Sequence, residues 1–270
     1  MATVVFLHAH PDDEALATGG TMARMADEGH RVVLVVATSG EEGEPVPGVL
    51  ATGESLGDRR VAELAEAAEI LGVERLVNLG YRDSGMVGED ANGRPDCFWQ
   101  ADVDEAAAYL ASALADEAPD VLVVYDPDGG YGHPDHIQVH RVGHRWAEMA
   151  DIDRVRWVTM NRDAIRTSIE AALADEDSWS DDGMLEQRRD RAESESFGMP
   201  DAEITHAIDV STVIGRKRAA IAAHASQIAP ESFFLAMPDE QFASAFGTEW
   251  FVDPGNPRRG GPQRTDLLLA

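Results

Sequence analysis

Short apolar runs alternate with helical patterns along the first 160 residues. The runs that predict buried strands are Val4–Leu7, Arg31–Ala37, Leu76–Leu79 and Val121–Tyr125. Between them, apolar residues recur at helical spacing over residues 14–28, 61–71 and 103–114. Strands that are apolar throughout and separated by helices predict a parallel sheet covered on both faces.

The pattern loosens after residue 150. Residues 155–160 and 204–210 resemble strands, residues 212–225 resemble a helix, and residues 174–200 are acidic without a clear period. We therefore predict an α/β, three-layer Rossmann-like fold with a mostly parallel central sheet and a small C-terminal extension.

Length and composition fit a single domain. The chain has 270 residues, of which 44% are hydrophobic, enough to fill one large core. We expect residues 1–160 to form that core and residues 161–270 to complete the same domain and cap its site. Within this extension, residues 161–203 are expected to carry a lid or outer pocket wall.

Charge and cysteine usage exclude several classes of partner. The net charge of −28 repels nucleic acid and anionic membranes, so we expect neither as a partner. The sequence has no apolar run long enough to span a bilayer and no signal peptide at its start, and it has a single cysteine, Cys97. These features predict a cytoplasmic protein without disulfides or thiolate metal clusters, and they leave a homo-oligomer open.

Two short motifs follow the first and fourth predicted strands. They are His10-Pro11-Asp12-Asp13-Glu14 and Gly132-His133-Pro134-Asp135-His136. Because the carboxyl ends of parallel strands are where sites are built, the imidazoles and carboxylates are expected to meet at one sheet edge. A mixed nitrogen and oxygen ligand set suits zinc or a similar divalent ion. The sequence therefore predicts a metallohydrolase.

Each motif also has a structural interpretation. Asp12 and Asp13 could cap a helix, since Pro11 starts helices well and carboxylates suit a first turn. His133 could be an exposed loop histidine. His8, two residues before His10 on the same side of a strand, is expected to be a buried core histidine.

The paired motifs resemble those of the PIG-L/LmbE-like zinc-dependent N-deacetylases. Further similarity lies in Thr38–Glu44 and Arg82–Met86, and the resemblance covers residues 3–160 and, more weakly, 204–228. The family includes deacetylases of N-acetylglucosaminyl-inositol in the mycothiol pathway, the most similar branch. It also includes mycothiol-conjugate amidases, chitobiose deacetylases and deacetylases of antibiotic sugars.

This resemblance implies roles for individual residues. The residues that would bind Zn²⁺, or another divalent ion such as Fe²⁺, are His10, Asp13 and His136. Two histidines and one carboxylate leave a coordination position open for water, as in catalytic zinc sites. The catalytic residues that it implies are Asp12 as general base, His133 as oxyanion stabiliser, Asp135 as its orienting carboxylate and Tyr131 near the same oxyanion. Arg60 and Asp83 would contact substrate hydroxyls.

The expected function is therefore removal of an N-acetyl group from a small N-acetylglucosamine-type conjugate. Within enzymes, the alternatives are an amidase acting on a larger acyl group or a mycothiol conjugate, and an antibiotic-sugar deacetylase. Outside enzymes, the alternative is a metal- or nucleotide-binding α/β module. The aspartates of the first motif argue against a nucleotide, because a phosphate cradle needs glycines and free backbone N–H groups there.

Overall fold

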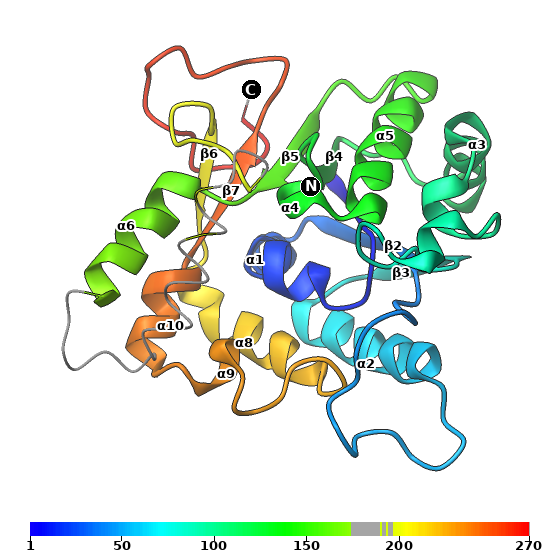
Figure 1. The fold of residues 1–270 in the computed structure, drawn as a ribbon. Helices are drawn as coiled ribbons and strands as arrows, with labels where there is room; N and C mark the ends of the chain where they lie inside the picture. The colour runs from blue at the N-terminus through cyan, green and yellow to red at the C-terminus, as the bar shows by residue number, and fades with distance from the viewer. Residues whose placement is uncertain (174–189, 191–192, 194–196, 270) are drawn as a thin grey trace.

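The computed structural model describes residues 1–173, 190, 193 and 197–269. Within them, seven strands form one sheet in the order β3-β2-β1-β4-β5-β7-β6 (Figure 1). The strands are β1 (Thr3–His8), β2 (Arg31–Thr38), β3 (Arg75–Tyr81), β4 (Val121–Tyr125), β5 (Val155–Thr159), β6 (His206–Asp209) and β7 (Thr248–Val252). β1 to β5 pair in parallel, and β7 joins β5 and β6 antiparallel. The predicted α/β fold with a mostly parallel sheet is confirmed.

Helices cover both faces of this sheet. They are α1 (Gly19–Asp27), α2 (Leu56–Leu71), α3 (Val103–Ala113), α4 (Gly129–Gly132), α5 (Pro134–Met149), α6 (Arg162–Leu173), α8 (Ile214–Ala223), α9 (Phe233–Ala236) and α10 (Asp239–Phe246). α1, α2 and α8 pack together on one face, while α3 and α5 pack together on the other (Figure 1). Among the described residues, none of these helices is long and apolar enough to cross a membrane.

The sheet core explains the apolar runs. In β1, β2 and β4, every residue from Val4 to Phe6, Val32 to Ala37 and Val121 to Val124 is fully buried. β-Branched residues dominate these strands because they pack well on a pleated surface that is covered on both sides. The order of the strands then places β1 beside β4, with β2 and β5 outside them.

The helices α4, α6, α9 and α10 were not predicted, and three further elements differ from the sequence-based expectation. The helix predicted over residues 14–28 begins with a π-helix, Glu14–Thr18, before α1. α5 was not predicted, because polar His136 and Gln138 lie on its buried face and weaken its apolar period. β7 was also missed, since it is a five-residue strand with a polar residue, Glu249, facing the interior.

The C-terminal third joins the same sheet through β6 and β7. About half of the predicted lid over residues 161–203 falls outside the described residues, as does most of the acidic stretch 174–200. The part of it that precedes residue 174 is the helix α6.

A buried ion pair ties the C-terminal elements to the first helices. Lys217, the only lysine of the sequence, donates from Nζ to Glu249 Oε1 at 2.5 Å and to the backbone carbonyl of Leu16 at 2.9 Å. The Glu249 carboxylate also accepts from the backbone N–H groups of Gly20 and Thr21, at 2.8 and 2.7 Å. Lys217 and Glu249 thus provide hydrogen-bond partners for backbone groups that lack a helical partner where the π-helix passes into α1.

Lys217→Met is therefore expected to lower the free energy of unfolding by about 3–5 kcal/mol, because it leaves the Glu249 carboxylate buried without its counter-ion. The measurement is urea denaturation of both proteins. Arg145→Met is the matched control, since Arg145 pairs with Asp104 on the surface and its loss is expected to change stability little. If Lys217→Met and the unmutated protein had the same free energy of unfolding, the ion pair between Lys217 and Glu249 would not stabilise the fold.

Candidate metal centre and active site

The two sequence motifs meet at the carboxyl ends of β1 and β4. The strands are neighbours, and the chain leaves β1 toward β2 on one side and reaches β4 on the other. This is a topological switch point, the position where open α/β sheets bind ligands. His10 and Asp13 follow β1, whereas His136 lies in the first turn of α5.

Asp13 lies close to both histidines of the predicted ligand set. Asp13 Oδ2 lies 3.3 Å from His10 Nδ1 and 3.3 Å from His136 Nε2. Ligand atoms at about 2.0–2.1 Å from a tetrahedral zinc ion are separated by about 3.3 Å. His10, His133 and His136 also offer ring nitrogens within 4.8 Å of one another. The buried histidines and the adjacent Asp13 carboxylate therefore form a donor group that could hold a divalent metal ion.

Hydrogen bonds at the far side of each histidine support this fit. His136 Nδ1 donates to the Gly129 carbonyl at 3.1 Å, which leaves Nε2 with a lone pair toward Asp13. His10 Nε2 donates to Asp135 Oδ2 at 3.2 Å, which leaves Nδ1 free on the side of Asp13. Metal-binding histidines nearly always donate their other N–H to a carbonyl or carboxylate in this way.

Asp12 occupies a strained position beside these ligands. Its φ of 102° lies in the left-handed region, which is uncommon for residues other than glycine. Arg60 Nη2 contacts Asp12 Oδ2 at 3.1 Å. The same guanidinium donates to the carbonyls of Pro11 and Gly40, so it links the Asp12 turn to the end of β2. A Cβ atom at Gly40 would collide with this guanidinium, which requires glycine there.

His133 keeps a donor toward the site in its neutral form. It is the N-cap of α5, and its Nδ1 accepts from the backbone N–H of Asp135 at 3.1 Å. The proton of the neutral ring is therefore on Nε2. Burial, with His10 and His136 nearby, lowers the pKa of His133 to about 2, so the ring is neutral at physiological pH.

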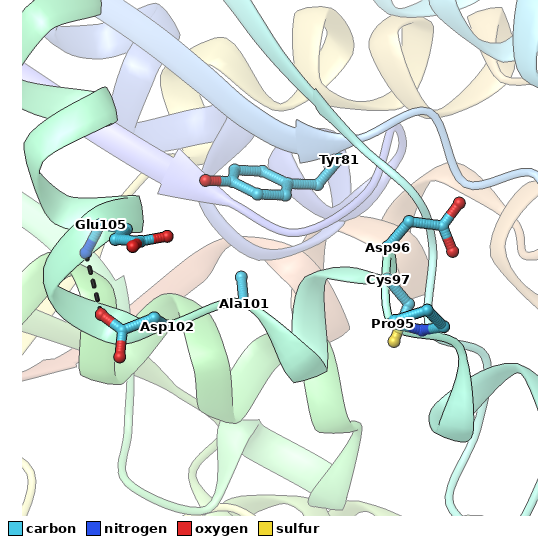
Figure 2. Close-up of a pocket in the computed structure, with 7 residues that line it drawn as sticks. All are labelled: Tyr81, Pro95, Asp96, Cys97, Ala101, Asp102 and Glu105. Atoms are coloured by element: carbon cyan, nitrogen blue, oxygen red, sulfur yellow. Dashed lines mark hydrogen bonds between the residues drawn. The ribbon is translucent and has the colours of Figure 1, made fainter.

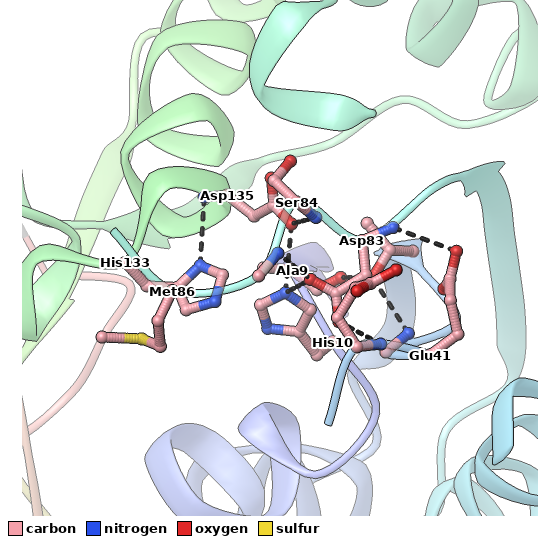
Figure 3. A network of polar contacts seen from close by, with 12 residues as sticks. Ala9, His10, Glu41, Asp83, Ser84, Met86, His133 and Asp135 are labelled. Carbon is pink, nitrogen blue, oxygen red and sulfur yellow. Dashed lines mark hydrogen bonds and ion pairs between the residues drawn. The ribbon is translucent and has the colours of Figure 1, made fainter. Parts of the chain in front are cut away.

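The Asp135 carboxylate lies between His10 and Ser84 (Figure 3). It accepts from the Ser84 backbone N–H at 2.9 Å and from the Ser84 hydroxyl, and it is fully buried. Among the described residues, the hydrogen bond between Asp135 and His133 uses the Asp135 backbone N–H and not the carboxylate. The carboxylate thus orients the ring of His10. That the Asp135 carboxylate orients His133 stays a prediction.

The remaining predicted residues lie around this centre. Asp83 Oδ1 is 3.4 Å from His10 Nε2, and its carboxylate also accepts from the backbone N–H groups of Gly85 and Glu42 (Figure 3). The Tyr131 hydroxyl is 3.5 Å from His136 Nε2, and the residue is 45% exposed, so it lies at the mouth of the site. The structure thus brings all the predicted residues together; whether Asp83 and Arg60 contact substrate stays a prediction.

The two adjacent aspartates have opposite ionisation behaviour. Burial raises the pKa of Asp12 to about 6, against the opposing charge of Arg60. For Asp13, burial is outweighed by His136 and His10, which hold its pKa well below the ordinary value. A carboxylate that stays ionised suits a metal ligand, and one with a raised pKa suits proton transfer near neutral pH.

Two contributors to this centre were not predicted from the sequence. Ser84 anchors Asp135, and Glu14 forms a buried pair with His224, whose Nε2 lies 2.6 Å from Glu14 Oε1. Ser84 lies in the Arg82–Met86 segment and Glu14 in the first motif, so both were within segments already singled out. Their partners are distant in the sequence, and no local pattern indicates such pairs.

A separate hollow lies between Tyr81 and residues 95–105 (Figure 2). Its walls carry the carboxylates of Asp96, Asp102 and Glu105 and none of the predicted site residues. Phe98, in the same loop, is fully buried and packs against Tyr81 with ring centroids 4.9 Å apart. Phe98 therefore belongs to the core, and the hollow is distinct from the metal centre.

Comparison with known proteins identifies the family. The model of PIG-L, GlcNAc-PI de-N-acetylase, matches residues 5–147. A 1D-myo-inositol 2-acetamido-2-deoxy-α-D-glucopyranoside deacetylase of Acidothermus cellulolyticus is 43% identical over 93% of this chain and 88% of its own length. The corresponding deacetylase of Streptomyces scabiei is 40% identical over 98% of this chain and 88% of its own.

Among solved structures, the N,N'-diacetylchitobiose deacetylase of Pyrococcus horikoshii has a TM-score of 0.54 and 22% identity, covering 93% of this chain and 82% of its own. At that identity the likeness supports the fold alone. The sequence relatives extend over nearly the whole chain, and the family model spans both metal-centre motifs. The chain therefore belongs to the PIG-L family and is an N-deacetylase.

Proposed function

We propose that the chain is a zinc-dependent hydrolase that removes the acetyl group from 1D-myo-inositol 2-acetamido-2-deoxy-α-D-glucopyranoside or a close N-acetylglucosaminyl conjugate. The observation that carries this proposal is the 43% identity, over 93% of the chain, to a deacetylase of that compound. The buried ligand group supports the metal part, because its spacing and its hydrogen-bonded histidines suit zinc.

His10, Asp13 and His136 would hold the metal ion. When bound there, the ion supplies a Lewis acid that polarises the acetyl carbonyl and makes water nucleophilic at neutral pH. A donor set of two imidazoles and one carboxylate suits both Zn²⁺ and Fe²⁺, and the proposal of zinc follows the resemblance to the zinc-dependent N-deacetylases.

The side chains around the ligands then handle protons and charge. Asp12 accepts a proton from the attacking water and passes it to the leaving amine as the C–N bond breaks. His133 donates its Nε2–H to the oxyanion that develops on the carbonyl oxygen. Tyr131 reaches the same oxyanion from the mouth of the site, and Asp135 keeps His10 oriented. The products are acetate and the free amino sugar.

Asp83 and Arg60 are the proposed contacts to sugar hydroxyls. Arg60 lies beside the site, with its Nη2 3.1 Å from Asp12 Oδ2. Asp83 is a buried carboxylate that can accept from a hydroxyl group. Buried polar groups paired to a substrate hydroxyl discriminate strongly against analogues that lack it.

The test is acetate release by zinc-loaded protein. The substrates are 1D-myo-inositol 2-acetamido-2-deoxy-α-D-glucopyranoside, free N-acetylglucosamine and an S-conjugate of mycothiol. We expect the inositol conjugate to be hydrolysed fastest, and treatment with a chelator to abolish release until zinc is restored. Fe²⁺ added in place of zinc serves to compare the two metals.

Each other result points to a different assignment. Faster cleavage of the mycothiol conjugate at its larger acyl group would make the chain an amidase. Release that persists after complete removal of metal would contradict the metal-dependent mechanism.

A further inference from the structure

Glu14 and His224 form a buried ion pair beside the metal centre. His224 follows the last residue of α8, and Glu14 begins the π-helix after the first motif. Both side chains are fully buried, and His224 Nε2 lies 2.6 Å from Glu14 Oε1. Nothing in the proposed reaction uses either side chain.

The second oxygen of Glu14 reaches the general base. Glu14 Oε2 accepts from the backbone N–H of Asp12 at 2.9 Å. The two oxygens of one carboxylate thus connect Asp12 to His224, a residue that lies more than 200 positions later in the sequence. Because α8 packs against α1 and α2, it holds His224 in a fixed place relative to this turn (Figure 1).

Asp12 needs such support. Its φ of 102° costs about 1–3 kcal/mol for a residue other than glycine, and such a conformation persists only where its surroundings fix it. The Asp12 carbonyl is held by the backbone N–H of Leu16 at 3.0 Å, and its carboxylate by Arg60. Glu14 supplies the remaining contact, the one to the Asp12 N–H.

We propose that Glu14 and His224 are positioning residues for hydrolysis. His224 orients the Glu14 carboxylate, Glu14 holds the Asp12 backbone in its left-handed conformation, and the Asp12 carboxyl is thereby placed for proton transfer. The inference rests on the proposed function, which makes Asp12 the base. It adds two side chains outside the proposed ligand set on which the placement of this base depends.

Two variants that differ by one methylene group test this. In His224→Gln, the side-chain amide N–H reaches the place of Nε2 and can still donate to Glu14. In His224→Asn, the amide reaches only the place of Nδ1, so Glu14 loses its donor although the site stays polar. A misplaced catalytic group costs up to about 10²-fold in rate, so we expect His224→Asn to lose 10- to 100-fold in kcat. KM and bound metal should stay near those of the unmutated protein, and His224→Gln should retain most of the kcat.

His206→Ala is the matched control. His206 is also fully buried and hydrogen-bonded, to Thr205 and to the Leu269 carbonyl, but it lies in the edge strand β6. The His206→Ala substitution is expected to lower the melting temperature of the protein without changing kcat. Near-normal kcat in His224→Asn, or equal losses in the Asn and Gln variants, would overturn the proposal, as would a loss of kcat that follows loss of metal.

Crystal structures of the unmutated protein and of His224→Asn give a readout that does not depend on activity. We expect Asp12 to leave the left-handed region in the variant; an unchanged Asp12 backbone would overturn the positioning role. Absence of acetate release by the unmutated protein would instead contradict the proposed function, while the Asp12 conformation would still report on the role of the pair.

Discussion

Replacing Asp12 with asparagine is expected to leave a folded protein that binds its metal but hydrolyses substrate about 10²–10⁴-fold more slowly, the usual contribution of a general base. The change removes the proton acceptor and little else. Asparagine has the same shape, tolerates positive φ as well as aspartate does, and still offers an oxygen to Arg60. The loss should therefore appear in kcat, measured as acetate release.

Asp151→Asn is the matched control for this substitution. Asp151 also has a positive φ, of 52°, but it is exposed and lies after α5, outside the site. Its replacement makes the same chemical change at a similar backbone conformation and should leave kcat unaltered. If Asp12→Asn stayed within tenfold of the unmutated rate with its metal bound, another group would have to be the base.

His136→Ala is expected to release the metal and abolish activity. His136 is one of the two imidazole ligands that we propose, and its Nε2 lies 3.3 Å from Asp13 Oδ2. Loss even of the groups that orient a ligand lowers metal affinity 10–100-fold, and loss of the ligand itself should cost more. Elemental analysis after desalting measures the bound metal, and circular dichroism establishes that the variant is folded.

His140→Ala is the control on the same helix. His140 lies one turn further along α5 and donates from Nδ1 to the Tyr125 carbonyl. The His140→Ala variant is expected to keep the bound metal and most of the hydrolytic activity. Stoichiometric metal in His136→Ala would remove His136 from the ligand set and point to His133, whose ring nitrogen is also within 4.8 Å of His10.

The central sheet could be predicted because its signals are local. Each parallel strand is an apolar run such as Val121–Tyr125, and burial on both faces requires such a run wherever the strand lies in the sheet. The π-helix after Asp13 could not be predicted in the same way. Its freed Leu16 carbonyl is satisfied by Lys217, from a helix two hundred residues later, so the local sequence does not reveal the change in helix type.

α5 also could not be predicted from local sequence, in this case because polar residues lie on its buried face. Its buried face carries His136, Gln138 and Asp135 because these side chains meet partners from other elements in the interior. Polar residues that are buried by function disturb the apolar period on which helix prediction relies. The helix was therefore missed where the site is built.

From the amino-acid sequence alone one can derive the buried strands, the residue types of the candidate metal centre and the family to which the two motifs point, because these depend on residues close together in the chain. The tertiary structure decided which side chains meet. It placed β1 beside β4, turned Arg60 toward Asp12, set Asp135 against His10 and joined Glu14 to His224. Such contacts depend on the packing of segments that are far apart in sequence, and each of the residues involved has several locally acceptable partners until the whole core is assembled.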